Sequence, residues 1–441
     1  MDQKFFHSVR LDKEKCKGCT NCLKRCPTEA IRVRGGRAHI INERCIDCGE
    51  CIRVCDYHAK YAQTDPLASI NRFKYKIALP APSLYGQFKH LVSASQVLEG
   101  LLKMGFDDVF EVAEGADIVT RAIRERMRGM GRDRYPVISS ACPAIVRLIR
   151  VRFPDLIPHI IDVRQPMEVA AMVARREFCR EHDAKPEEVG CFFITPCAAK
   201  VTAIRNPIGH ETSAVDGAIS MLEIYGLLSS HIKSSPVDAA HPAHATAYGV
   251  GWASSGGEAA AVCPEHSMSV DGIENVIRVL DQIENGNMPS LEFIELNACS
   301  AGCVGGTMAV ENPYIAKTRL QTLRRYLPVT QNWSYKEKNA DTFVPEEYFS
   351  GDRLKYQPIT LLDNDMDAAM RKMQAIEEIN ERLPHLDCGS CGSPTCHAFA
   401  EDIVNGEANE NECIVKMRER IRKFLAKDGP AGKEREPDDR T

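Results

Sequence analysis

The sequence lacks several features that would assign it to a large class of proteins. It has no apolar run of about 18 residues that could cross a bilayer, and its N-terminal stretch MDQKFFHSVRLDKEK lacks the apolar core of an export signal. It also has no large excess of charge, because 56 Lys and Arg stand against 61 Asp and Glu. We therefore predict a cytoplasmic protein that binds neither membranes nor nucleic acid.

Cysteine, by contrast, is abundant. The chain has 19 cysteines in 441 residues, and in a reducing compartment thiols at regular spacing indicate metal sites rather than disulfides. Sixteen of them fall into groups that can bind metal. The other three, Cys179, Cys191 and Cys263, are predicted to be small buried apolar residues.

Two cysteine groups near the N-terminus share the spacing CxxCxxCxxxC, in CKGCTNCLKRC and CIDCGECIRVC. In this pattern three thiolates of one loop bind a [4Fe-4S] cluster and the fourth binds the neighbouring cluster. A pair of zinc sites is the alternative. The segment resembles bacterial two-cluster ferredoxins over about 50 residues, with Asp56 where that family has proline. The predicted ligand sets are Cys16, Cys19, Cys22 and Cys55 for one cluster, and Cys45, Cys48, Cys51 and Cys26 for the other.

A third group lies near the C-terminus, where CGSCGSPTC precedes one distant cysteine. It resembles the four-cysteine [4Fe-4S] domain of Rnf-type electron-transfer subunits and corrinoid iron-sulfur proteins, and zinc is the alternative. Its predicted ligands are Cys388, Cys391, Cys396 and Cys413.

The remainder of the chain alternates short apolar runs, such as KIALP, VGCFFITP and LEFIELNA, with helix-like segments. This alternation predicts an α/β fold with parallel sheets flanked by helices. The stretch AIRVRGGRAHII predicts a hairpin around Gly35 and Gly36. We expect a ferredoxin-like α+β domain at 1–70, the α/β domain at 71–362, a linker helix at 363–386, a small iron-sulfur domain at 387–426 and a disordered tail at 427–441.

Four cysteines of the α/β region lie in three loops, SSACP, TPCAAK and ELNACSAGCVGG. In order and spacing these loops resemble the signatures of the [FeFe]-hydrogenase catalytic domain, a two-lobed fold, over residues 75 to 360. The resemblance implies an H-cluster, in which a [4Fe-4S] cubane joins a diiron subcluster carrying CO, cyanide and an amine-containing dithiolate. It makes Cys142, Cys197 and Cys299 ligands of the cubane, makes Cys303 the bridge to the diiron subcluster, and places Lys200 beside a cyanide.

The same resemblance implies further residues of the diiron pocket. Pro82 and Ser83 match positions near a cyanide, Gln165 matches one near the bridging carbonyl, and Trp252 matches one that packs against the cluster. Thr195 and Asn297 stand where catalytic members have methionine, which would make the pocket more polar.

Ala141 is the main departure from the family pattern. Catalytic members have a cysteine there, whose thiol passes protons toward an acidic chain, and alanine can neither give nor accept a proton. Ile123 and Arg126 stand near the positions of the acidic pair, and His159 near that of the relay hydroxyl. More than one part of the relay is therefore predicted to be missing.

We predict from this pattern a sensory or regulatory [FeFe]-hydrogenase-like protein that reacts slowly with H₂ and passes electrons through its [4Fe-4S] clusters to a signalling partner. One alternative is a catalytic hydrogenase or electron-bifurcating subunit with another proton path. Another is an iron-sulfur scaffold without the diiron site. A homodimer formed through the helix at 365–383 is a further alternative to packing of that helix on its own chain.

Overall fold

The computed structural model describes residues 5–234, 243–263, 265–288, 290–329, 344–358, 362–363 and 365–428. The chain divides into two compact units. Unit 1 comprises Met1–Lys15 and Asn42–Ile359, and unit 2 comprises Cys16–Ile41 and Thr360–Thr441. Residues 16–41 thus group with the C-terminal segment, whereas the sequence suggested one ferredoxin domain at 1–70.

Unit 1 is built on two parallel sheets. The larger sheet has the order β6-β5-β8-β9, and the smaller has the order β10-β11-β7. Every residue of β8 is buried, as expected for a parallel strand covered on both faces. The bounds are β5 Tyr75–Pro80, β6 Asp108–Val109, β7 Val137–Ile138, β8 Val189–Thr195, β9 Gly217–Ser220, β10 Ser267–Asp271 and β11 Phe293–Asn297.

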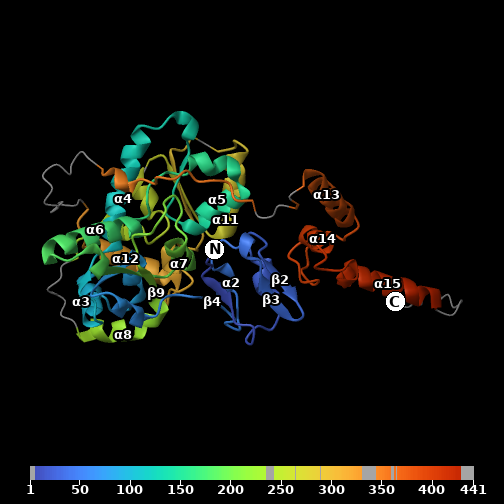
Figure 1. The fold of residues 1–441 in the computed structure, drawn as a ribbon, viewed down its shortest axis with the longest axis horizontal. Helices are drawn as coiled ribbons and strands as arrows, with labels where there is room; N and C mark the ends of the chain where they lie inside the picture. The colour runs from blue at the N-terminus through green and yellow to red at the C-terminus, as the bar shows by residue number, and fades with distance from the viewer. Residues whose placement is uncertain are drawn as a thin grey trace, which may run out of the picture. The chain divides into compact units, whose positions relative to one another are not determined.

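Helices cover these sheets in unit 1 (Figure 1). Helix α6 packs on β5 and β8, and α10 and α11 pack on the smaller sheet. The predicted α/β class is therefore confirmed. The helices are α2 Glu50–Arg53, α3 Ser95–Lys103, α4 Val112–Arg128, α5 Pro143–Arg152, α6 Pro166–His182, α7 Ala198–Arg205, α8 Met221–Ser234, α9 Ala247–Gly251, α10 Gly257–Val262, α11 Ile273–Glu284 and α12 Pro313–Arg324. Strands β1 Val9–Leu11 and β4 Lys60–Ala62 form a separate antiparallel pair.

The carboxyl ends of the parallel strands deliver the cysteine-containing loops. Cys142 follows β7 and caps α5, and Cys197 follows β8 and caps α7. Cys299 follows β11 by two residues. Open parallel sheets place their ligand sites at this end of the strands, so the chain positions its thiols where such folds carry chemistry.

Unit 2 joins segments from opposite ends of the sequence. The predicted hairpin is confirmed: β2 Ile31–Arg34 pairs with β3 Arg37–Ile40, and Gly35 and Gly36 take positive φ angles of 55° and 71°. Helix α14 Cys396–Val404 contributes Asp402 to an ion pair with Arg32 of β2, and Figure 1 shows the blue hairpin beside this red helix. The other helices are α1 Asn21–Lys24, α13 Met366–Glu381 and α15 Ile414–Asp428.

The linker helix expected at 363–386 corresponds to α13. It packs on α14 through a small apolar cluster that contains Ile376 and Phe399, so it is packed within its own chain. The tail expected to be disordered from 427 lies outside the described residues, except for the last residues of α15.

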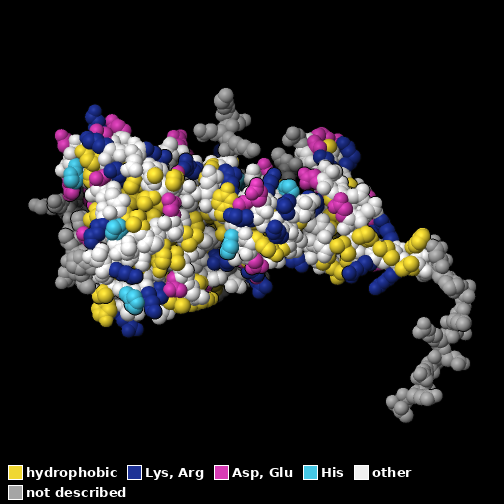
Figure 2. Space-filling model, turned by 90° about the horizontal axis from the view of Figure 1, so that it is seen from below, with side chains coloured by type: hydrophobic (Ala, Val, Ile, Leu, Met, Phe, Trp, Pro, Cys, Tyr) yellow, Lys and Arg dark blue, Asp and Glu magenta, His cyan; other side chains and the backbone are white. Residues whose placement is uncertain are grey.

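None of the described helices is long and apolar enough to cross a membrane. Figure 2 shows basic and acidic side chains interspersed on the face that it presents, in keeping with a net charge of -5.

Candidate functional site

Four cysteines on the loops that follow unit 1's parallel strands line one cavity of about 90 Å³, which we call the cysteine cavity. They arrive on the three loops that the sequence singled out. The cavity thus gathers four sulfur ligands from turns that are up to 161 residues apart in sequence: Cys142, Cys197, Cys299 and Cys303.

Burial makes these thiols hard to ionise without a cation. It raises the pKa of Cys197 to about 11 and that of Cys303 to about 12, and the neighbouring thiols add to both shifts. Burial raises the pKa of Cys299 well above its usual range as well. A metal centre binds the thiolate form and supplies the missing positive charge. The donor set therefore suits a metal cluster better than a group of free thiols.

Lys200 is the buried cation of this cavity. Its Nζ donates hydrogen bonds to the Ala141 carbonyl and to Oε1 of Gln165, each at 2.8 Å. Burial lowers the pKa of Lys200, while the surrounding cysteines oppose this shift. The Ser83 hydroxyl also lines the cavity, and it is buried with no hydrogen-bond partner among the described residues. Two polar groups are thus available to a bound cofactor with acceptor atoms.

Most of the other predicted pocket residues lie at the same cavity. Pro82, Thr195, Trp252 and Asn297 line it. The Thr195 hydroxyl accepts a hydrogen bond from the backbone N–H of Cys197 at 3.1 Å and so orders that loop. Gln165 does not line the cysteine cavity, and it is joined to residues near that cavity by hydrogen bonds to Lys200 and to the Ser140 carbonyl.

Ala141 lines the cavity directly beside Cys142, as the sequence suggested. Its backbone N–H donates to the Ser139 hydroxyl at 3.1 Å. Ile123 is buried in the apolar core, and His159 Nδ1 faces the backbone carbonyl of Arg134 at 3.1 Å. Arg126 is paired with Asp162 on the surface. Among the predicted relay positions, Ala141 lines the cysteine cavity, whereas Ile123, Arg126 and His159 do not.

Sequence reasoning missed a pair of buried carboxyl groups at this cavity. Both oxygens of Glu258 contact the Ser139 hydroxyl, at 2.7 and 2.8 Å. Burial raises the pKa of Glu258 well above its usual range, and Glu295 raises it further. Burial also raises the pKa of Glu295, which accepts a hydrogen bond from Asn297 at 2.7 Å. A proton-binding group therefore lies two hydrogen bonds from Ala141.

The sequence held a signal for this pair. Glu295 is the one charged residue of β11, whose neighbours are apolar, and Glu258 opens the alanine-rich helix α10. Acidic residues in buried strands and helices are rare unless they are partnered. That rule could have marked both residues, but it could not have shown that they meet.

The loop of the second cysteine group, residues 45–55, which we call the second ferredoxin loop, forms charged contacts with helix α5 beside the cysteine cavity. Asp47, between Cys45 and Cys48, accepts from His7 Nδ1 at 2.7 Å and from Arg147 of α5 at 3.2 Å. Arg147 is almost fully buried, which lowers its pKa, and the thiols Cys45 and Cys197 both act against this shift. One guanidinium thus lies in the field of both predicted cluster sites.

The first four cysteines belong to unit 2 and the next four to unit 1. Backbone N–H groups donate to their sulfur atoms in the same way in both loops: Ala30 to Cys26 at 3.2 Å, and Ala59 to Cys55 at 3.3 Å. The loop that contains Asp56, the departure from the ferredoxin pattern, therefore makes the same N–H to sulfur hydrogen bond as the loop that contains Pro27. The exchange of Cys26 and Cys55 between the two clusters stays a prediction.

The C-terminal cysteine loop packs on strand β2 within unit 2, close to the first cysteine loop at residues 16–26. Arg34 donates to the Cys391 carbonyl at 2.9 Å, and the Val33 N–H donates to the Gly392 carbonyl at 2.8 Å. Lys24, two residues from Cys22 and Cys26, acts electrostatically on Cys388. The two predicted cluster loops are therefore direct neighbours.

The fold and cysteine pattern match known families. The family described as iron only hydrogenase large subunit, C-terminal domain, matches residues 74–267 and 264–307. A 4Fe-4S dicluster domain matches 8–56, and an Fe-S cluster family matches 383–415. The iron-sulfur character predicted for both ends of the chain is confirmed at this level.

Several curated proteins are similar to parts of the chain. The periplasmic [Fe] hydrogenase large subunit of Nitratidesulfovibrio vulgaris is 28% identical over 44% of this chain and 50% of its own length. The NADP-reducing hydrogenase subunit HndD of Solidesulfovibrio fructosivorans is 21% identical over 44% and 39%. A cytosolic Fe-S cluster assembly factor NAR1 from Yarrowia lipolytica is 25% identical over 29% and 27%. The chain thus spans half or less of these relatives.

Solved structures show the same fold. A variant of the [FeFe]-hydrogenase HydA1 from Chlamydomonas reinhardtii matches with a TM-score of 0.50 and 16% identity, covering 66% of this chain and 98% of the other. The hydrogenase family match spans more than half of this chain. The chain therefore belongs to the iron-only hydrogenase large-subunit family.

Proposed function

We propose that this protein reacts slowly with H₂ at an H-cluster held in the cysteine cavity, and that it reports the outcome to a signalling partner through its iron-sulfur clusters. The observation that carries the proposal is the position of Ala141. Its methyl group lies in the wall of the cavity, beside Cys142, where the family resemblance calls for a proton-carrying thiol.

The cavity's own residues fit such a cofactor. An H-cluster would supply the iron-based chemistry that cleaves H₂ into protons and electrons. Four cysteines would hold its iron, and the Lys200 ammonium and Ser83 hydroxyl would donate to its polar ligands. Burial of these groups keeps water out and strengthens each of these contacts.

Protons need an acceptor other than a thiol at position 141. Glu258 is the supported candidate, because burial raises its pKa above the ordinary range and the Ser139 hydroxyl, which contacts it, also accepts from the Ala141 N–H. Glu295 lies next along this route and receives N–H donors from Gly256 and Ala259. This path has more steps than transfer through a single thiol, so we expect slow exchange of protons.

Electrons have two supported connections. Arg147 and Asp47 link the second ferredoxin loop to α5, which begins after Cys142. In unit 2, Arg34 holds the C-terminal cysteine loop against strand β2, close to the first cysteine loop. We infer a series of three [4Fe-4S] clusters besides the cubane, with the C-terminal cluster beside the first ferredoxin cluster.

A slow centre suits detection better than metabolism. Loss of one positioned proton-transfer group costs about 10²- to 10⁴-fold in rate. A detector needs only to equilibrate with H₂, and its equilibrium response does not depend on rate.

A second candidate function is a catalytic hydrogenase, which the buried Glu258 and Glu295 pair favours because it places acid-base groups near the cavity in place of the thiol. Infrared spectroscopy of matured protein, under H₂ and then under inert gas, tests both readings. Bands of metal-bound CO and cyanide that respond reversibly to H₂ support H₂ chemistry at this site. Their absence from fully matured protein would leave an iron-sulfur scaffold or electron-transfer protein. Turnover comparable with a standard [FeFe] hydrogenase would favour the catalytic reading over the sensory one.

A further inference from the structure

A larger cavity, separate from the cysteine cavity, lies between segments 157–165 and 346–354 of unit 1. It has a volume of about 720 Å³ and is lined by several arginines, so we call it the arginine cavity. Small-molecule sites in proteins occupy about 300–1,000 Å³. The arginine cavity is therefore large enough for a metabolite.

Several buried nitrogen atoms of its lining residues have no hydrogen-bond partner. Nε of Arg134, Nε of Arg164 and both ring nitrogens of His210 are buried and make no hydrogen bond within the described structure. The His210 side chain is only 8% exposed, and its nearest carboxylate, on Glu168, is 3.7 Å away. Buried polar groups in native proteins are nearly always satisfied. The Nε–H groups of the two arginines are donors, so they favour a ligand with acceptor atoms.

The acidic residues of the cavity are occupied elsewhere or lie at its rim. Asp162 is paired with Arg126, which lowers the pKa of Asp162 although burial acts in the opposite direction. Glu346 and Asp352 are exposed, as is Arg353 beside them in the sequence. The rim is thus balanced in charge, whereas Arg134 and Arg164 keep the interior positive.

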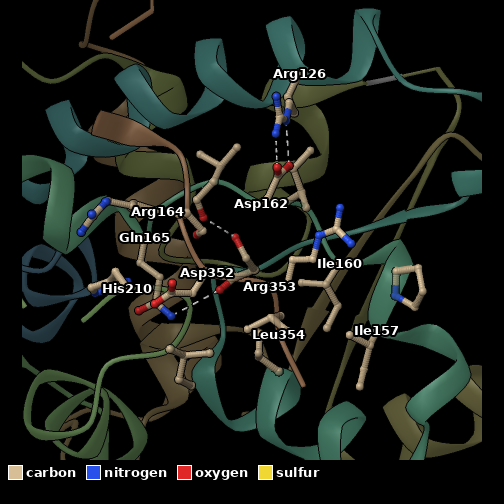
Figure 3. A pocket seen from close by; sticks show the side chains of 18 of the residues that line it. Arg126, Ile157, Ile160, Asp162, Arg164, Gln165, His210, Asp352, Arg353 and Leu354 are labelled. Carbon is tan, nitrogen blue, oxygen red and sulfur yellow. Dashed lines mark hydrogen bonds and ion pairs between the residues drawn. The ribbon is translucent and has the colours of Figure 1, made fainter. Parts of the chain in front are cut away.

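The cavity also has an apolar side. Ile157, Ile160 and Leu354 line it, and Figure 3 shows them away from the side where Arg164, Gln165 and His210 gather. A ligand that fills both sides would need a charged end and an apolar body.

We propose that the arginine cavity binds a small organic anion, whose carboxylate or phosphate group contacts Arg164, His210 and Gln165 and whose apolar part lies on Ile157 and Leu354. Arginine suits this role because its planar guanidinium binds either oxyanion with two hydrogen bonds. Nothing in this binding step depends on H₂ chemistry.

The ligand would also act on the cysteine cavity. Gln165 lines the arginine cavity, donates through Nε2 to the Ser140 carbonyl at 3.3 Å and accepts from Lys200 at 2.8 Å. An anion that draws the Gln165 amide toward itself changes the hydrogen bonding of Lys200. This second part rests on the proposed function, because Lys200 is then a contact of the H-cluster. The anion is an effector of that centre.

Binding is tested by calorimetric titration of the full-length protein with its iron-sulfur clusters in place. The probes are pentanoate and butyl phosphate, which carry the two oxyanions on similar chains, and pentanamide, the uncharged match. We expect saturable binding of at least one oxyanion and none of pentanamide. Preference for one oxyanion identifies the chemical source of the ligand. Equal binding of pentanamide, or no binding of either oxyanion, overturns the proposal.

Variants locate the site. Arg164→Gln is expected to weaken binding about tenfold or more, because it removes a charge-assisted contact. Arg353→Gln at the exposed rim is expected to have a smaller effect of the same sign and serves if Arg164→Gln fails to fold. Arg278→Gln on the exposed face of α11 is the control for net charge and should bind like the parent. Equal binding by all of these proteins places the anion elsewhere and overturns the assignment.

Coupling is read separately, from infrared bands of the matured protein with and without the bound probe. A shift of the cyanide bands that is absent from Gln165→Leu protein saturated with the probe supports the effector role. Binding without any shift overturns that role and leaves the binding site standing. Absence of CO and cyanide bands altogether counts against the proposed function instead, so the two failures are distinguishable.

Discussion

Arg32 donates through Nε to both carboxylate oxygens of Asp402, at 2.9 and 2.7 Å, although the two residues are 370 positions apart in the sequence. Their side chains are 5% and 4% exposed. Arg34 adds a further bond to Asp402 at 2.7 Å. This network joins strand β2 to helix α14 in unit 2.

Arg32→Gln should therefore destabilise unit 2 strongly. Removing one partner of a buried ion pair typically costs about 3 kcal/mol or more, and in this variant Asp402 keeps only its ion pair with the partly exposed Arg34. The exposed pair of Arg371 and Asp365, 4.0 Å apart, supplies the matched control. Arg371→Gln should cost at most about 1 kcal/mol. Chemical denaturation monitored by iron-sulfur absorbance measures both, and equal effects of the two substitutions would contradict the role of the buried network.

Gly392→Ala should separate the two cysteine loops. Gly392 has a φ of +86°, and a Cβ there would lie 1.9 Å from the Val33 carbonyl oxygen, the backbone to which the loop is joined. Gly406→Ala is the control, since Gly406 has a φ of +76° but nothing within 4 Å of its Cβ position. Both variants carry the backbone strain of about 1–2 kcal/mol. Only Gly392→Ala should weaken the magnetic interaction between reduced clusters in electron paramagnetic resonance spectra.

Ala141→Cys should raise H₂ turnover if the missing thiol limits the rate. We expect a gain toward about 10²-fold, the low end for a positioned acid-base group, because Ile123 offers the new thiol no further acceptor. Ala141→Ser adds a similar volume without an acidic thiol and should gain little. Hydrogen uptake with an artificial electron acceptor measures all three proteins. An unchanged rate in Ala141→Cys would favour an existing efficient path.

Glu258→Gln should slow H₂ turnover by about 10²-fold or more, since an amide cannot relay a proton. Its effect on stability depends on pH. A carboxyl group whose pKa is raised by folding stabilises the fold below its ordinary pKa and loses that contribution as the pH rises through the raised value. Above about pH 4.5 the parent should thus lose stability relative to Glu258→Gln.

Glu125→Gln is the control for these two measurements. Its side chain is 50% exposed and is paired with Arg128 on the surface of α4. It should change neither the turnover nor the pH dependence of thermal unfolding. A Glu258→Gln protein with parental turnover would remove Glu258 from the proton path.

Lys200→Met should impair the diiron part of the cofactor while leaving the cubane in place. Methionine keeps the apolar stem but removes the ammonium that faces Gln165 and the Ala141 carbonyl. We expect the cubane to be retained, since the four cysteines are intact, and the CO and cyanide infrared bands after maturation to be weakened or lost. Iron content and infrared spectra report the two parts independently. Normal bands in Lys200→Met would show that Lys200 is dispensable.

Local spacing was sufficient to predict the features that depend on neighbouring residues. The three loops that carry Cys142, Cys197 and Cys299 follow parallel strands as expected, and the hairpin turns at Gly35. The meeting of the four cysteines was predicted through the family resemblance, but other contacts between distant segments were not, because a single sequence carries no information about which segments pair. Glu258 and Glu295 meet only when α10 packs on β11.

The same limit explains Gln165 and the division of the ferredoxin segment. Gln165 matches a family position by its local motif, yet its side chain lies in the wall of another cavity and is joined to residues near the cysteines by hydrogen bonds to Lys200 and to the Ser140 carbonyl. Residues 16–41 associate with the C-terminal segment through Arg32 and Asp402, a pair that no local pattern joins.

The Arg32 and Asp402 network also has a consequence for synthesis of the chain. During translation the hairpin leaves the ribosome long before Asp402 does. Until then Arg32 and Arg34 have no ion pair with Asp402 and are solvated by water. This network can form only after the segment that contains Asp402 has been made. Insertion of the C-terminal iron-sulfur cluster would therefore follow synthesis of this segment. A chain that stops before the last cysteine loop leaves the hairpin without the buried carboxylate of Asp402.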